Sequence, residues 1–180
     1  MRRAIVLARK AFGRTSPNPM VGAVVVKGGG VVGEGYHSRA GQPHAEIEAL
    51  SRAGHYARSA DLYVTLEPCC YFGRTPPCTE AIIEAGIKRV FVGMKDPNKQ
   101  VSGKGLRSLK KHGIVIVPDV LKEECVKLNK PFIKMMKTGI PFVTLKTAMS
   151  LDGKIATRSG DSRWITGKLA RNHVHKIRNQ

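Results

Sequence analysis

Helix-like and strand-like patterns alternate along this chain, and the alternation restricts the architectures that it can adopt. Residues 3–12 have the apolar spacing of a helix, whereas residues 21–27 and 31–36 have the composition of strands. Three consecutive glycines at 28–30 separate the two strands, which predicts a β-hairpin.

Downstream of the hairpin the alternation continues. In chain order we expect a helix at 44–53, a strand at 62–66, a helix at 78–85, a strand at 89–93, a helix at 105–112, a strand at 114–117 and a helical stretch at 121–137 that Pro131 kinks or divides. A hairpin whose sheet grows through crossover helices is typical of a layered α/β domain. The sequence therefore predicts about five strands covered by helices.

A domain boundary is expected at the G-I-P sequence of residues 139–141, which divides the chain into 1–138 and 139–180. Beyond it the pattern predicts a strand at 142–148 and a helix from about residue 167 to the end. This carboxy-terminal segment is too short to build a core of its own. It either packs on the first domain or forms the front of a second one.

The composition is that of a folded domain without a membrane-spanning segment. Apolar residues make up 42% of the chain, and no apolar run is long enough to cross a bilayer. Residues 1–8 begin like a signal peptide, but Arg9 and Lys10 end the apolar part too early. We therefore expect a cytoplasmic protein, in which the four cysteines are more naturally metal ligands than disulfides.

The net charge of +18 raises the question of a nucleic-acid or phosphorylated small-molecule partner. The 31 lysines and arginines are scattered, however, and the densest cluster, at residues 107–112, is short. The charge alone therefore favours a solvated surface over a face that binds nucleic acid.

His44, Glu46, Cys69 and Cys78 form the most informative set of residues. Imidazole and thiolate groups are preferred zinc ligands, and a catalytic zinc site with three protein ligands keeps its fourth position for water. His-x-Glu followed by Pro-Cys and a further cysteine is the signature of zinc deaminases, in which the glutamate moves protons. The set predicts a Zn²⁺ site at His44, Cys69 and Cys78, with Glu46 as the catalytic acid and base.

The sequence also allows other interpretations of these residues. Cys70 could replace Cys69 as the ligand, and Cys70 or His37 could close a purely structural zinc site. Glu46 argues against a closed site, which has no use for a carboxylate there. The ligand set also suits iron or cobalt. Cys125, in a helical stretch, is expected to be part of the core.

Several motifs together resemble the family of bifunctional riboflavin-biosynthesis deaminase/reductases, over essentially the whole chain. The motifs are SPNP at 16–19, VG at 21–22, HAE at 44–46, TLEPCC at 65–70, GRTPPC at 73–78 and DPN at 96–98. Eight residues separate the two ligand cysteines, as in this family. In tRNA adenosine deaminases and cytidine deaminases the gap is usually two residues, in the pattern P-C-x-x-C. The resemblance implies a cytidine-deaminase-like three-layer α/β/α sandwich with a mixed sheet of about five strands.

The resemblance also implies a hydrolase and its substrate, a phosphorylated diaminohydroxy-ribosylaminopyrimidine whose ring amino group is replaced by oxygen with release of ammonia. By the same resemblance, Asn18 and His37 line the pyrimidine pocket. Arg74, Asp96 and Asn98 contact ribose and phosphate. The planar guanidinium of Arg74 suits a phosphate, since it can bind two oxygens at once.

The tail resembles the start of the family's reductase domain, which is similar to dihydrofolate reductase and uses NADPH. The motifs are VTLKTAMSLDGK at 143–154 and SRWITG at 162–167. Family contacts to NADP match Ala148 and Trp164, and contacts to the reductase substrate match Ser162 and Arg178. Most of the reductase sheet would follow Gln180, so we expect this chain to have deaminase activity only. Oxidoreductase activity is expected of a full-length, multifunctional enzyme.

Two alternative functions remain. A tRNA or nucleoside deaminase of the same superfamily agrees with the net charge, but the cysteine spacing and the reductase-like tail oppose it. A non-enzymatic zinc module would not need Glu46. The expected partner is therefore a phosphorylated pyrimidine, not nucleic acid or a membrane, and the resemblance leaves a homo-oligomer open.

Overall fold

The computed structural model describes residues 1–72, 76–99 and 101–178. The chain forms two compact units, Met1–Phe142 and Val143–Gln180. Within the described residues, no helix combines the length and the apolar character needed to cross a bilayer.

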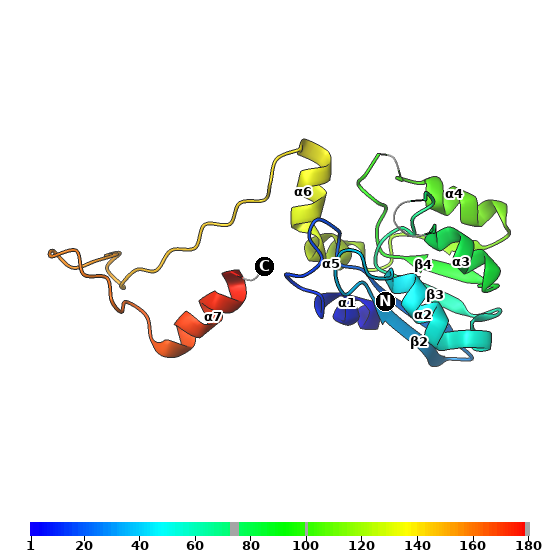
Figure 1. Ribbon diagram of the computed structural model, residues 1–180, viewed down its shortest axis with the longest axis horizontal. Coiled ribbons are helices and arrows are strands. Elements are labelled where there is room, and N and C mark those ends of the chain that lie inside the picture. Colours follow the sequence, from blue (N-terminus) through cyan, green and yellow to red (C-terminus); the bar gives the residue numbers. More distant parts are fainter. Residues whose placement is uncertain (73–75, 100, 179–180) are drawn as a thin grey trace. The chain divides into compact units, whose positions relative to one another are not determined.

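A mixed sheet forms the centre of the first unit (Figure 1). Its five strands in the described residues follow the order β2-β1-β3-β4-β5. β1 (Gly22–Lys27) and β2 (Gly30–Tyr36) form the predicted hairpin. β3 (Asp61–Val64) pairs antiparallel with β1, whereas β4 (Arg89–Val92) and β5 (Val115–Val117) extend the sheet in parallel. The prediction of about five strands in a mixed sheet is confirmed.

Three helices cover one face of the sheet: α2 (Ala45–Ala53), α3 (Cys78–Glu84) and α4 (Lys104–Lys111). They pack on alternate strand residues that are almost fully buried, namely Ala23, Val25, Leu62, Val64, Val90 and Val92. Gly33 and Gly35 let α2 lie directly on β2, since a Cβ there would sit 2.2 Å and 2.4 Å from carbonyl oxygens of α2. This close approach fixes the start of α2. A 3₁₀ turn (Gly54–Ala57), which the sequence did not indicate, follows α2.

The other face is covered by α1 (Arg2–Arg9) and α5 (Lys122–Leu128), which contact each other. A Cβ at Gly22 would lie 2.0 Å from a carbonyl oxygen of α1, and one at Gly93 would lie 2.3 Å from Cys125 Sγ. Cys125 is fully buried, which confirms that it belongs to the core. Helices on both faces confirm the three-layer α/β/α sandwich.

The helical stretch predicted at 121–137 is divided, and the break lies at Asn129. Asn129 leaves helical geometry with φ −116° and ψ 24°, and Pro131 occupies the first turn of α6 (Lys130–Thr138). The Asn129 side chain is buried and bonded at both ends to Met20: its Oδ1 accepts the Met20 N–H at 2.8 Å, and its Nδ2 donates to the Met20 carbonyl at 2.9 Å. The break therefore fastens the α5–α6 corner to the loop before β1.

The strand predicted at 142–148 is wrong, because the structure has no regular secondary structure across 140–150. A strand requires a partner for its backbone hydrogen bonds, and no described strand pairs with this segment. Val143 and Leu145 are 77% and 86% exposed. The last predicted helix is present as α7 (Lys168–Arg178), and none of the described residues from 143 to 178 is buried.

Candidate metal centre and active site

Three predicted ligands converge at the amino-terminal ends of two helices. His44 precedes α2, Cys78 begins α3, and Cys69 lies in the loop that follows β3. His44 Nδ1 lies 3.1 Å from Cys78 Sγ and 3.5 Å from Cys69 Sγ, and the three ligand atoms lie within 4.8 Å of one another. A tetrahedral zinc with Zn–S of about 2.3 Å and Zn–N of about 2.0 Å separates N and S by roughly 3.5 Å. The geometry fits zinc, and Cys70 is not a member of the cluster.

Hydrogen bonds around Cys69 favour its thiolate. The Cys78 thiol and the His44 ring bond to the Cys69 sulfur, and the Cys78 N–H donates to it at 3.3 Å. These bonds lower the pKa of Cys69 to about 4, whereas the pKa of Cys78 is raised because its thiol is the donor in the pair. A metal cation would displace the proton that the two sulfurs share, because thiolate is the ligand form.

Glu46 lies in the first turn of α2 and is only 4% exposed. Burial raises its pKa to about 7, and the negative charge of Cys69 adds to the shift. A carboxyl group with a pKa near neutral can both accept and release a proton at physiological pH. This is the ionisation expected of a proton carrier beside a metal.

A cavity of about 300 Å³ adjoins the ligand cluster. Its lining includes seven of the predicted site residues, namely Asn18, His37, His44, Glu46, Cys69, Asp96 and Asn98. Cys78 is fully buried and is not among the lining residues. The prediction for Arg74 lies outside the described residues. The structure thus brings the predicted metal, proton-transfer and pyrimidine-pocket residues to one place.

His37 and Asn18 form a defined hydrogen-bonded pair in this cavity. The ring Nδ1 of His37 lies 3.1 Å from the Pro43 carbonyl oxygen, which can only accept, so Nδ1 carries the proton. The Nε2 atom is then the acceptor for the amide nitrogen of Asn18 at 3.1 Å. Burial lowers the pKa of His37, which favours this neutral ring. The carbonyl end of the Asn18 amide is left to meet a ligand.

Glu67 is a site residue that was not predicted from the sequence. Its buried carboxylate accepts backbone N–H groups from Asp96 (3.3 Å), Gly103 (2.9 Å) and Leu106 (3.4 Å). It therefore holds the loop of Asp96 and Asn98 against the start of α4, beside the loop that carries Cys69. Its sequence signal is an acidic residue directly after a buried strand.

The cavity also has apolar walls that were not predicted from the sequence. The additional lining residues include Leu66, Tyr71, Phe132 and Met136. The last two come from α6, far along the chain from the motifs. Their apolar character alone could not distinguish them from core residues.

The predicted reductase residues lie in the second unit, spread along its chain. Ala148 is in the irregular segment, Ser162 and Trp164 precede α7, and Arg178 is the last residue of α7. Trp164 is 70% exposed, and the guanidinium carbon of Arg171 lies 4.2 Å from its ring centroid. The roles of these four residues stay predictions.

Comparison with known proteins gives family matches in both units. Residues 1–94 match the cytidine and deoxycytidylate deaminase zinc-binding region, and residues 141–180 match the RibD C-terminal domain. The riboflavin biosynthesis protein RibD of Haemophilus influenzae is 54% identical over 99% of this chain, which covers 48% of that protein. The chain thus spans about half the length of the curated relatives it matches.

Solved structures agree with these matches. RibD of Acinetobacter baumannii aligns with a TM-score of 0.94 and 50% identity over 99% of this chain and 50% of its own. A diaminohydroxyphosphoribosylaminopyrimidine deaminase/5-amino-6-(5-phosphoribosylamino)uracil reductase of Thermotoga maritima aligns with a TM-score of 0.93 and 52% identity over 99% and 51%. With its ligand cluster and cavity inside the matched fold, the chain belongs to the family of cytidine and deoxycytidylate deaminase zinc-binding proteins.

Proposed function

We propose that this chain catalyses the hydrolytic deamination of the diaminohydroxyphosphoribosylaminopyrimidine intermediate of riboflavin biosynthesis. The observation that carries the proposal is the convergence of His44, Cys69 and Cys78 beside the buried Glu46, at a cavity that also holds the Asn18–His37 pair. Relatives at about half identity that carry the name of this pathway support the choice of substrate.

The ligands and Glu46 divide the chemistry between them. His44, Cys69 and Cys78 would hold a zinc ion, which when bound lowers the pKa of a water and so supplies the nucleophile. Glu46 takes the proton that this water loses, then delivers protons to the ring nitrogen and to the departing amine. One water is consumed and one ammonia is released, so the ring gains oxygen in place of nitrogen.

The remaining cavity residues bind and orient the substrate. The Asn18 amide, held by His37, presents its carbonyl oxygen to a donor on the pyrimidine ring. Asp96 and Asn98 supply polar groups for the ribose, since the Asp96 carboxylate accepts the Asn98 N–H at 2.8 Å and fixes this turn. We assign the phosphate to Arg74 from the family motif alone.

For residues 139–180 we propose the role of an opening segment of an NADPH-dependent reductase domain in a longer protein. The match to the RibD C-terminal domain supports this role. The proposed contacts are Ala148 and Trp164 for NADPH, and Ser162 and Arg178 for the reductase substrate.

Glu46→Gln tests the proposed chemistry, because glutamine keeps the shape of the side chain and cannot carry the proton. We expect ammonia release to fall by at least about a hundredfold, in line with the loss of a general acid–base, while bound zinc stays unchanged. The matched control is Glu48→Gln, two residues along the same helix, which removes only a surface ion pair with Arg52. Undiminished ammonia release by the Glu46 variant would falsify the mechanism.

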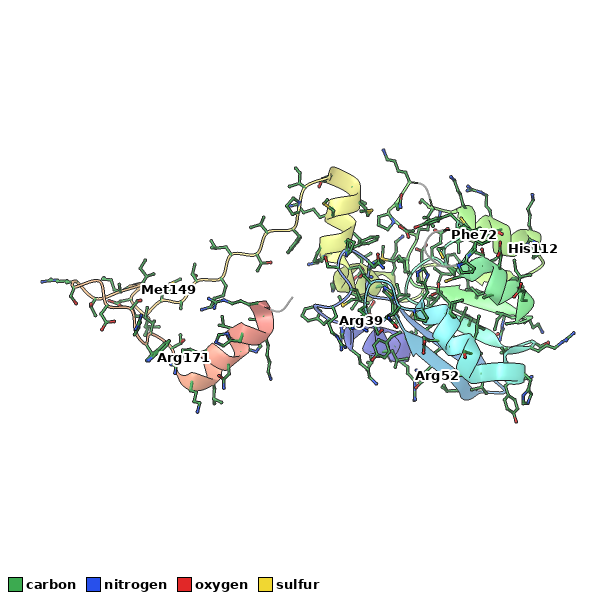
Figure 2. The ribbon with its side chains drawn as sticks, viewed as in Figure 1. Arg39, Arg52, Phe72, His112, Met149 and Arg171 are labelled. Carbon is green, nitrogen blue, oxygen red and sulfur yellow. The ribbon has the colours of Figure 1, made fainter. Side chains whose placement is uncertain are left out.

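A nucleic-acid deaminase is the weaker alternative. Figure 2 shows the labelled cationic side chains Arg39 and Arg52, together with His112, at separate places on the first unit. The RibD relatives and the match to the RibD C-terminal domain support a small pyrimidine substrate instead. Salt-dependent binding of tRNA together with inactivity on the pyrimidine nucleotide would favour the alternative.

We infer a cytoplasmic location from the chemistry of the cysteines. The four of them are free thiols, and a thiolate metal site is compatible with a reducing compartment. A homo-oligomer stays a prediction, and the molar mass of the purified chain in solution, measured by light scattering, tests it.

A further inference from the structure

Helix α6 contributes a wall to the cavity that none of the deaminase motifs contains. Phe132 and Met136 both line the cavity, and because they are four residues apart they lie on one face of α6. Ile133 is the α6 residue that packs on the core. Phe132 is half-buried and Met136 is 39% exposed. These two side chains therefore face the cavity instead of completing the core.

The position of this wall is set at the α5–α6 corner. Asn129, which is only 2% exposed, directly precedes α6 and bonds at both ends of its amide to the backbone of Met20. Met20 is two residues from Asn18, which forms the polar contact with His37 in the same cavity. A single buried amide thus couples the apolar wall to the loop that carries the ring-binding asparagine.

The two kinds of lining suit different parts of a planar heterocycle. The edge of the ring carries hydrogen-bond donors and acceptors, which Asn18 and Glu46 can meet. The faces of the ring are apolar and pack well against an aromatic ring or a thioether. Phe132 supplies a ring, and Met136 supplies a thioether. A role in the hydrophobic core would not explain why Phe132 and Met136 are partly exposed. It would also not explain the hydrogen bonds from Asn129 to Met20 that fix the start of α6.

We propose that Phe132 and Met136 pack on the face of the pyrimidine ring and determine ring affinity, and that Asn129 is a positioning residue that sets their place. This inference rests on the proposed deaminase function and extends it to residues outside the motifs. The wall contributes to binding and not to proton transfer, so its loss should raise KM and leave kcat nearly unchanged.

Met136→Ala and Phe132→Ala test the wall, with Met135→Ala as the matched control. Met135 is the same residue type on the same helix, is 46% exposed and does not line the cavity. We expect KM for the diaminopyrimidine nucleotide to rise about five- to tenfold in the first two variants, as loss of a few buried carbons implies. In the control, KM should change by less than about twofold. Zinc content and kcat should be the same in all three.

Asn129→Ala tests the positioning role through a double-variant comparison with Met136→Ala. If Asn129 acts through the wall, its substitution should raise KM in the otherwise unchanged chain and add little once Met136 is already alanine. Met136→Leu, which restores the volume, should recover most of the lost affinity. Strictly additive effects on KM would remove Asn129 from this role, whatever the variant does to stability.

The outcomes separate this inference from the function on which it rests. An unsubstituted, zinc-loaded chain that releases no ammonia from the nucleotide overturns the proposed function and the wall together. An active unsubstituted chain whose Phe132 and Met136 variants match the Met135 control in KM overturns the wall alone.

Discussion

At the cavity, Asp96 combines an expected substrate role with an ionisation that burial opposes. Burial raises its pKa to about 6 from 3.8, the hydrogen bond from Asn98 opposes this shift, and the nearby charge of Glu67 adds to it. The folded chain therefore holds this proton more tightly than the unfolded chain does. As pH rises from about 4 to about 6, the unfolded state loses the proton first, so the unfolding free energy falls progressively across this window. Above about pH 6 the loss of unfolding free energy that this group causes stays constant.

Asp96→Asn should consequently stabilise the chain at pH 7 and impair its function. The expected gain in unfolding free energy is on the order of 1 kcal/mol, since one pKa unit equals about 1.4 kcal/mol and partial exposure screens the effect. Denaturant titrations should show the gain at pH 7 and not at pH 4, while KM rises. The control Glu123→Gln, at an exposed position on α5, should change neither the unfolding free energy nor KM. Equal stability of Asp96→Asn and the unsubstituted chain at both pH values would contradict a raised pKa for this carboxyl group.

At the scale of elements, the site depends on how closely α2 lies on β2, because α2 carries His44 and Glu46 at its start. Gly35→Ala would place a Cβ 2.4 Å from the Ala45 carbonyl oxygen, so α2 must move away. We expect a loss of about 3 kcal/mol of unfolding free energy, typical of overpacking, and weaker zinc retention. Gly30→Ala is the control in the same strand, since its Cβ would meet its nearest atom at 3.6 Å. If chelator competition shows equal zinc retention in both variants, α2 does not set the ligand geometry.

The elements also show what sequence can and cannot predict. The hairpin and the ligands were predictable because their signals are local: three glycines between strands, and ligand motifs at or near helix starts. Phe132 and Met136 were not, because an apolar pair four residues apart looks the same whether it faces a core or a cavity. The strand expected at 142–148 failed because apolar composition does not supply a pairing partner.

At the scale of the whole molecule, the ligand cluster, its cavity and the described buried core lie in the first unit. The residues that line the cavity run from Pro17 to Met136, and the buried apolar residues end at Leu128. The second unit, Val143–Gln180, has no buried residue in its described part. Stability and the proposed deamination should therefore both be properties of residues 1–142.

Truncation after Phe142 tests this division directly. The shortened chain should keep its zinc, its kcat and its KM within about twofold, because it loses no described residue that is buried or lines the cavity. Truncation after Leu128 is the informative comparison: it keeps the buried apolar residues and the ligands but removes α6 together with Asn129, so KM should rise while zinc stays bound. Loss of ammonia release in the chain that ends at Phe142 would mean that the second unit supports the active site. Equal KM in the two truncated chains would instead mean that α6 does not contact the substrate.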